Sequence, residues 1–171
     1  ATDVRVFVNE VLQTYTTDYT ISGSTITFVV APIVSDTVQV LVDPVYAFIG
    51  EPGSHKTYVY ALALTGTIYK LVQTLDNSGS STDLYGASTA VSSDGSKLLV
   101  GASYKSSKGK VYFYHRTGAD KYHRTYSLLA SLDGENVGDY FGNSLQMSAD
   151  GTTAYIAAYK AKPQENGAVY V

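Results

Sequence analysis

The sequence predicts an all-β protein in which a small N-terminal module precedes a series of similar antiparallel sheets. Hydrophobic residues make up 44%, enough for a core, while charged residues make up only 16% and tyrosine occurs 16 times. That balance favours strands over surface helices. Apolar and polar residues also alternate in many short segments. Finally, several short words recur in order along residues 84–171, which indicates repeated structural units.

The N-terminal module is expected to be sandwich-like, with about four antiparallel strands. Val4, Val6 and Val8 fall on one face of the first strand. Gly23 supplies the positive φ of a hairpin turn, and Pro32 ends the following strand because proline cannot donate to a strand ladder. The expected strands are residues 4–9, 18–21, 25–30 and 37–42. The acids are expected to serve in turns and caps: Asp3, Glu10, Asp18, Asp36 and Asp43.

These residues resemble a module found in bacteriophage tail-fibre proteins, namely the N-terminal, tail-attaching domain of podovirus-type fibres. The resemblance is carried by residues 6–13, 18–28, 31–32 and 35–40, and it covers about residues 4–42. One departure is Glu10, where many members have glycine. The resemblance implies attachment to a phage tail and, for a fibre, assembly as a trimer.

The second part of the chain repeats itself. Leu84-Tyr85-Gly86 recurs as Tyr140-Phe141-Gly142. The same offset separates Gly86 from Gly142 and Asp94 from Asp150. Residues 99–104 and 109–113 recur as 155–160 and 167–171, and an earlier half-copy at 48–52, 59–60 and 71–76 parallels 99–103, 111–112 and 128–133. The recurrence predicts three related units, of which one is complete.

Each unit is expected to form four short strands, which in the complete unit are residues 87–92, 97–102, 111–114 and 126–130. Asp94-Gly95 is interpreted as a two-residue turn whose twist matches the flanking strands. Four antiparallel strands every ~50 residues is the period of a propeller blade. Because one sheet cannot cover both its faces, the units must stack on neighbours. About two and a half blades are expected, with the others beyond Val171 or in neighbouring subunits.

These units resemble FG-GAP repeats, the blades of integrin α-subunit-type β-propellers, over about residues 46–171. The words that carry the resemblance are Phe141-Gly142, Gly101-Ala102-Ser103, Gly50-Glu51-Pro52 and a closing Gly-x-Val-Tyr at 109–112 and 167–170. The departures are Tyr85 in place of phenylalanine and Ala157-Ala158 in place of Gly-Ala. The Asp-x-Asp-x-Asp-Gly loop through which integrin blades bind calcium is absent from the sequence.

One acidic stretch is a candidate metal site. Residues 133–139 place three acids and Asn136 close together, and oxygen-rich loops hold calcium. The stretch lacks the alternating ligands and the distal bidentate glutamate of a calcium loop, so a turn between blades is the preferred interpretation. Calcium binding stays open as the alternative.

Other candidate residues favour structural interpretations. His55, His115 and His123 are spread over different units without a carboxylate pattern that completes a metal site, so they are expected in solvent-facing loops. Residues 86–90 superficially resemble a nucleophile elbow, but no helix follows them. Tyr104 and Tyr159 follow equivalent strands. They are expected to pack blade on blade, with contact to a glycan or protein ligand as the alternative.

Composition excludes several function classes. The absence of cysteine excludes disulfides, thiolate zinc sites and a cysteine nucleophile. A net charge of -3 argues against nucleic-acid binding. No apolar run approaches the ~20 residues of a membrane-spanning helix. The sequence therefore predicts no catalytic residue, no cofactor and no metal ligand.

The expected organisation is a tail-fibre-like module at 1–44 and FG-GAP-like propeller repeats at 45–171. With the two resemblances, this predicts a non-enzymatic, structural or adhesive component of the bacteriophage tail. Its expected partners are other virion tail proteins, further copies of itself, and a host cell-surface glycan or protein. The alternative is a bacterial extracellular adhesin or surface filament subunit.

Overall fold

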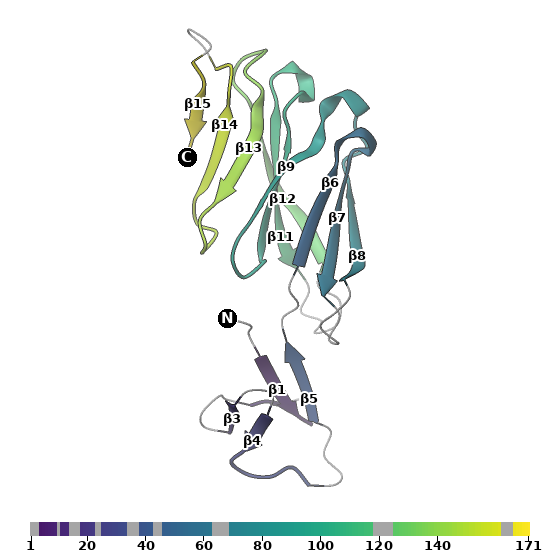
Figure 1. Ribbon diagram of the computed structural model, residues 1–171, viewed down its shortest axis with the longest axis vertical. Helices are drawn as coiled ribbons and strands as arrows, with labels where there is room; N and C mark the ends of the chain where they lie inside the picture. Colours follow the sequence, from purple (N-terminus) through teal and green to yellow (C-terminus); the bar gives the residue numbers. More distant parts are fainter. Residues whose placement is uncertain are drawn as a thin grey trace. The chain divides into compact units, whose positions relative to one another are not determined.

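The structure is a computed structural model that describes residues 4–9, 11–13, 18–22, 25–33, 38–42, 46–62, 69–117, 125–161 and 166–171. The chain divides into two compact units, Ala1–Val45 and Tyr46–Val171, one residue from the boundary expected from the sequence. Figure 1 shows the strands of both units. No helix in the described ranges is long and apolar enough to cross a membrane.

The N-terminal unit consists of short antiparallel strands. In its three-stranded sheet β1 lies between β2 and β5, and β3 pairs with β4 in a separate hairpin. The bounds are β1 Val4–Val8, β2 Val11–Leu12, β3 Tyr19–Ser22, β4 Thr25–Phe28 and β5 Val38–Val42. Ser22 pairs with Thr25 across the turn, so the predicted hairpin is confirmed. The turn glycine Gly23 and four of the five acids assigned to turns (Asp3, Glu10, Asp36 and Asp43) lie outside the described residues.

The C-terminal unit contains three antiparallel sheets that follow one another along the chain (Figure 1). The first sheet is β6 Tyr46–Glu51, β7 Lys56–Leu62 and β8 Tyr69–Asp76. The second is β9 Tyr85–Val91, β10 Lys97–Ala102, β11 Lys110–Thr117 and β12 Thr125–Asp133. The third is β13 Phe141–Met147, β14 Ala154–Ala158 and β15 Ala168–Tyr170. Short 3-10 turns lie at η1 Pro52–Ser54, η2 Ser81–Asp83 and η3 Lys105–Ser107. The all-β prediction is confirmed.

The sequence recurrence is also a recurrence of backbone geometry. Between β9 and β10 the register shifts as Gly101 pairs with Ser88 and Ala102 with Tyr85. The same shift occurs between β13 and β14, at the equivalent positions. Leu84 and Tyr140, which precede the first strand of each sheet, both have a φ of 56°. The second and third sheets are therefore two copies of one structural unit as far as the third extends.

The three strands of the first sheet, β6, β7 and β8, correspond to β10, β11 and β12 of the second sheet. Gly50 pairs with Thr57 as Gly101 pairs with Val111, which confirms that 48–52 parallels 99–103. The β8 and β12 strands carry a register shift at the same place. The expected match of Val59-Tyr60 to Val111-Tyr112 is wrong, because the pairing aligns Thr57-Tyr58 with that dipeptide.

The Asp94-Gly95 turn differs from the two-residue turn expected from the sequence. Ser92 to Ser96 all lie between β9 and β10, and of these only Gly95 has a positive φ. The two-residue turn would need positive φ at both central residues. The longer loop forms because the Asp94 carboxylate accepts hydrogen bonds from the backbone N–H of Ser96 and from the hydroxyl groups of Ser92 and Ser96.

The equivalent loop of the third sheet has the same bonds. The Asp150 carboxylate accepts from the Ser148 hydroxyl at 2.6 Å and from the Thr152 backbone N–H at 3.0 Å. These hydrogen bonds favour the charged form, and they lower the pKa of both Asp94 and Asp150 to about 2. Each loop is thus held by a carboxylate that must remain ionised.

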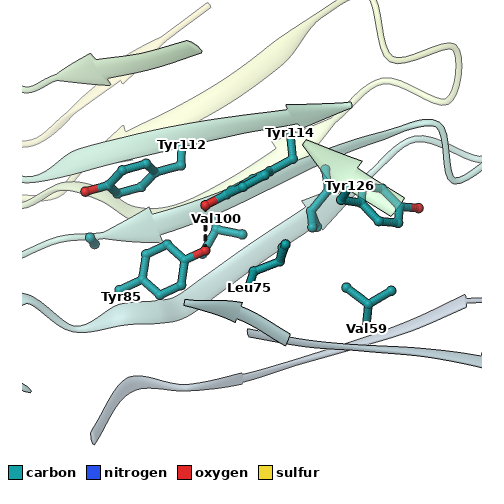
Figure 2. Close-up of a cluster of buried hydrophobic side chains, with 9 residues drawn as sticks. Val59, Leu75, Tyr85, Val100, Tyr112, Tyr114 and Tyr126 are labelled. Atoms are coloured by element: carbon teal, nitrogen blue, oxygen red, sulfur yellow. Dashed lines mark hydrogen bonds between the residues drawn. The ribbon is translucent and has the colours of Figure 1, made fainter. Parts of the chain in front are cut away.

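Two apolar layers separate the three sheets. The layer between the first and second sheets contains Val59, Leu75, Val100 and a group of tyrosines (Figure 2). The hydroxyl groups of Tyr85 and Tyr114 hydrogen-bond each other there at 2.8 Å, and burial raises the pKa of both side chains. The layer between the second and third sheets contains Leu99, Val111, Phe141, Ile156, Ala158 and Ala161.

Glycine allows the sheets to approach closely at two equivalent points. A Cβ atom on Gly50 would overlap the backbone carbonyl of Gly86, and one on Gly101 would overlap that of Gly142. Neither Gly50 nor Gly101 has a positive φ, so glycine is required there for space rather than for backbone conformation. At the same register position the third sheet has Ala157.

The far side of the third sheet is uncovered in this structure. Tyr155 and Val169 are 43% and 65% exposed. Their counterparts in the second sheet, Leu99 and Val111, are 1% and 0% exposed because the third sheet packs on them. A sheet seated here in the same way would meet the methyl group of Ala157.

We expect Gly101→Ala to destabilise the C-terminal unit by roughly 1–3 kcal/mol, because the added methyl overlaps a carbonyl group that cannot move without separating the sheets. Ala157→Gly is the matched control, and its cost should be only about 0.5–1 kcal/mol from chain entropy. Urea unfolding measures both. Equal costs would contradict the close-approach argument.

We also expect stability to fall as the pH drops from about 4 to about 2. Asp94 and Asp150 have their ordinary pKa of 3.8 when unfolded but about 2 when folded, so in this window the unfolded chain binds more protons. Thermal unfolding of the wild type and of Asp94→Ala/Asp150→Ala tests this. The variant should be less stable at neutral pH and should lose less stability in this window. Parallel curves would show that these carboxylates are not responsible.

Candidate functional site

The two tyrosines singled out from the sequence are brought together by a third. The rings of Tyr104 and Tyr140 are 4.7 Å apart between centroids at 61°, and those of Tyr140 and Tyr159 are 5.0 Å apart in a stacked arrangement. Tyr104 follows β10, Tyr140 precedes β13 and Tyr159 follows β14. The three rings form a row, here called the tyrosine row, across the ends of the second and third sheets.

The row is both a packing contact and an exposed surface. Tyr104 and Tyr159 are 45% and 47% exposed, while Tyr140 between them is half-buried. The predicted packing contact is therefore present between the second and third sheets, but it leaves much of two aromatic rings in solvent. Interaction with the Tyr140 hydroxyl raises the pKa of Tyr104.

A lysine accompanies the row. The Lys160 ammonium lies 5.2 Å from the ring centroid of Tyr140 and 5.8 Å from that of Tyr159. These are cation–π distances. Among the residues that the structure describes, no carboxylate forms an ion pair with Lys160. The row thus combines flat rings, hydroxyl groups and one positive charge.

The acidic stretch at 133–139 does not converge on one point. It connects β12 to β13, as a turn between sheets would. Asp133 pairs with Lys110 at 3.0 Å, Glu135 is exposed and Asp139 is buried. Within the described ranges no group of three or more histidine, aspartate or glutamate side chains is placed to hold a metal ion.

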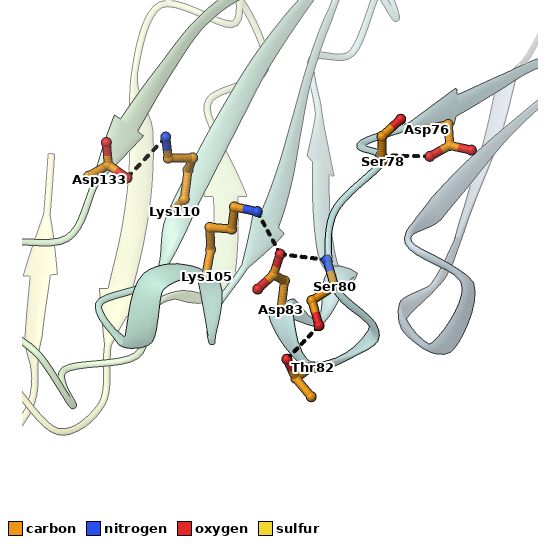
Figure 3. A network of polar contacts seen from close by, with 8 residues as sticks. All are labelled: Asp76, Ser78, Ser80, Thr82, Asp83, Lys105, Lys110 and Asp133. Carbon is orange, nitrogen blue, oxygen red and sulfur yellow. Dashed lines mark hydrogen bonds and ion pairs between the residues drawn. The ribbon is translucent and has the colours of Figure 1, made fainter.

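Two equivalent buried aspartates have different surroundings. Asp83 accepts hydrogen bonds from the Ser80 backbone N–H and from the Lys105 ammonium, the latter at 2.6 Å (Figure 3). Burial alone would raise the pKa of Asp83, but these bonds outweigh it and the pKa lies below its ordinary value. The two loops are equivalent in their backbone hydrogen bonds. The Tyr104 N–H donates to the backbone carbonyl of Asp83, and the Lys160 N–H donates to that of Asp139.

Asp139 lacks the lysine that Asp83 has. It is 1% exposed, and its Oδ2 accepts from the Asn136 amide at 3.0 Å. Its Oδ1 has no hydrogen-bond partner in the described part of the chain. Ala161 occupies the position that corresponds to Lys105. The third sheet therefore keeps the buried acid but not its ion pair.

The histidines are not brought together. His55 lies in the turn before β7, and His115 lies on β11, opposite Ser127. The expectation of a loop position is wrong for His115, because the β11–β12 ladder extends to Thr117. His123 lies outside the described residues.

The segment 86–90 is not a nucleophile elbow, because the next element is the strand β10 and not a helix. It lies within β9, and the hydroxyl of Ser88 donates to the backbone carbonyl of Gly142 at 2.6 Å. This bond joins the second sheet to the third.

Sequence reasoning missed Tyr140 and Lys160. The sequence did carry a signal for Tyr140. When the two repeats are aligned, Tyr140 stands where the preceding unit has Leu84, so an aromatic residue replaces an aliphatic one just before a strand. Lys160 carried no signal, since one lysine near a strand end is ordinary in a sequence.

We expect Asp83→Asn to destabilise the protein by about 1–3 kcal/mol, because it removes the charge that Lys105 pairs with in a buried setting. Asp139→Asn is the matched variant. It keeps an acceptor for Asn136 and removes an unpaired buried charge, so the unfolding midpoint should stay the same or rise. Chemical unfolding of both variants decides this. A larger loss for Asp139→Asn would show that Asp139 has a partner of its own.

Comparison of the sequence with protein-family models and with curated proteins returns no match.

Proposed function

We propose that this chain is a structural and adhesive component of a bacteriophage tail. In this role the N-terminal unit attaches to the tail, and the C-terminal unit presents loops toward a host surface. The observation that carries the proposal is the repeated stacking of sheets through Gly50 and Gly101. A stack of similar sheets is a stiff scaffold, and scaffolds of this kind bind through the loops at their ends. The tail location is supported by the resemblance of residues 4–42 to tail-fibre modules.

The stacked sheets are proposed to be blades of an FG-GAP-like propeller. This proposal is supported by the residues of the FG-GAP-like motifs, because each of them has a structural role. Gly101 makes the close approach between sheets, Phe141 fills the layer behind it, and Gly142 provides the carbonyl that Ser88 binds. Other tail proteins and further copies of the chain are the proposed partners.

A non-enzymatic role is supported by how the polar groups are used. Asp94 and Asp150 hold their own loops. Asp83 pairs with Lys105, and the Tyr85 and Tyr114 hydroxyl groups bind each other. These groups already have structural tasks, and reactive groups must instead be free to meet a substrate.

Antibodies raised against the purified chain test the proposed location. Phage particles and bacterial cells from the source culture are labelled and viewed by electron microscopy. We expect label on particle tails, and antibody pre-absorbed with the chain is the control. Label confined to the surface of uninfected cells would overturn the proposal in favour of a bacterial adhesin.

Fluorescently labelled chain tests adhesion separately. It should bind host cells and compete with phage adsorption. If the chain binds host cells but does not compete with phage adsorption, the chain is adhesive but the proposed role in the phage tail is wrong.

A further inference from the structure

The tyrosine row is not a requirement of the repeated fold. The junction between the first and second sheets has the same backbone arrangement, but Leu84 stands where Tyr140 stands and has the same φ of 56°. Ser103, which is 5% exposed, occupies the position of Tyr159. The loop after β6 carries Pro52, Gly53 and Ser54 and no tyrosine. A junction of this kind therefore closes without aromatic side chains at the three positions that correspond to the row.

The row also leaves apolar area in water that the fold could have avoided. Tyr104 and Tyr159 remain about half exposed although small residues fit the equivalent places. Tyrosine has only two rotatable side-chain bonds, so it offers flat contact area with a hydroxyl tip at a small entropic cost. These properties suit a ligand that has both C–H faces and hydroxyl groups, as a saccharide does.

Charge narrows the ligand class. Lys160 lies over the rings of Tyr140 and Tyr159 without a carboxylate partner in the described part of the chain. The chain as a whole carries a net charge of -3, so an anionic ligand would be repelled unless a local cation received it. An ammonium beside stacked rings is placed to receive one acidic group of a saccharide.

We propose that Tyr104, Tyr140, Tyr159 and Lys160 form a binding platform for an acidic saccharide. The rings contact the C–H faces of the sugar units, the tyrosine hydroxyl groups exchange hydrogen bonds with sugar hydroxyl groups, and Lys160 pairs with a carboxylate of the glycan. This inference rests on the proposed adhesive function, since it names the site and the ligand class through which adhesion occurs.

The repeats supply the test variant. Tyr140→Leu/Tyr159→Ser places the residues of the first junction into the second, so the backbone already accommodates them at equivalent positions. Tyr155→Ala is the control, because Tyr155 is 43% exposed on the same sheet but lies away from the row. Lys160→Gln removes the charge alone. Thermal unfolding checks that each variant keeps the midpoint of the parent chain.

The probe is a printed array of acidic and neutral bacterial surface oligosaccharides, followed by titration of the strongest acidic ligand. We expect the native chain to bind acidic members. The affinity of the double variant should be lower by a factor of about ten or more, since the variant lacks two aromatic contacts. Lys160→Gln should lower the affinity for the acidic ligand. It should leave unchanged the affinity for the same ligand after its carboxyl groups have been reduced. Tyr155→Ala should bind as the native chain does.

Several results would overturn the inference. If the native chain binds no saccharide on the array, the ligand class is wrong. If the double variant binds as tightly as the native chain, the site lies elsewhere. Binding of the labelled native chain to whole host cells separates these failures from failure of the adhesive function. Cell binding abolished by protease treatment of the cells would point to a protein receptor instead of a saccharide.

Discussion

The C-terminal unit depends on how closely neighbouring sheets can approach. At Gly50 and Gly101 the strand of one sheet lies against the backbone carbonyl of the next, in a space that excludes a Cβ atom. This contact sets the spacing at which Val59, Leu75 and Val100 fill one layer and Leu99, Val111 and Phe141 fill the other. Since protein interiors are close-packed, a change in this spacing would open both layers. The glycines are therefore the points on which the packing of the larger side chains depends.

Tyrosine has two uses in this unit, one in the core and one at the ends of the sheets. Inside, the Tyr85 and Tyr114 hydroxyl groups bind each other and the Tyr126 hydroxyl donates to the Gly95 carbonyl, so these three buried hydroxyl groups have partners. At the ends of the sheets, Tyr104 and Tyr159 pack by their rings against Tyr140 and remain about half exposed. The high tyrosine content thus serves both the core and the candidate binding surface.

The repeats keep their backbone and vary their ends. The register shift, the positive φ before the first strand and the carboxylate-held loop occur in both the second and third sheets. The side chains around these features differ, because Lys105 is replaced by Ala161 and Leu84 by Tyr140. The two sheets therefore share their backbone features and differ in the side chains around them. The tyrosine row and the unpaired carboxylate of Asp139 are particular to one junction.

The sequence by itself determined the all-β class, the recurrence and most strands, although β2 at Val11–Leu12 was not expected. These features are local, because a strand imposes the alternation of apolar and polar residues directly. The sequence did not determine the length of the Asp94 loop, since side-chain bonds to Ser92 and Ser96 override the two-residue turn. It named Tyr104 and Tyr159 but not the ring that joins them. Only tertiary structure decided that, because the three rings come from separate segments that meet when the second and third sheets pack.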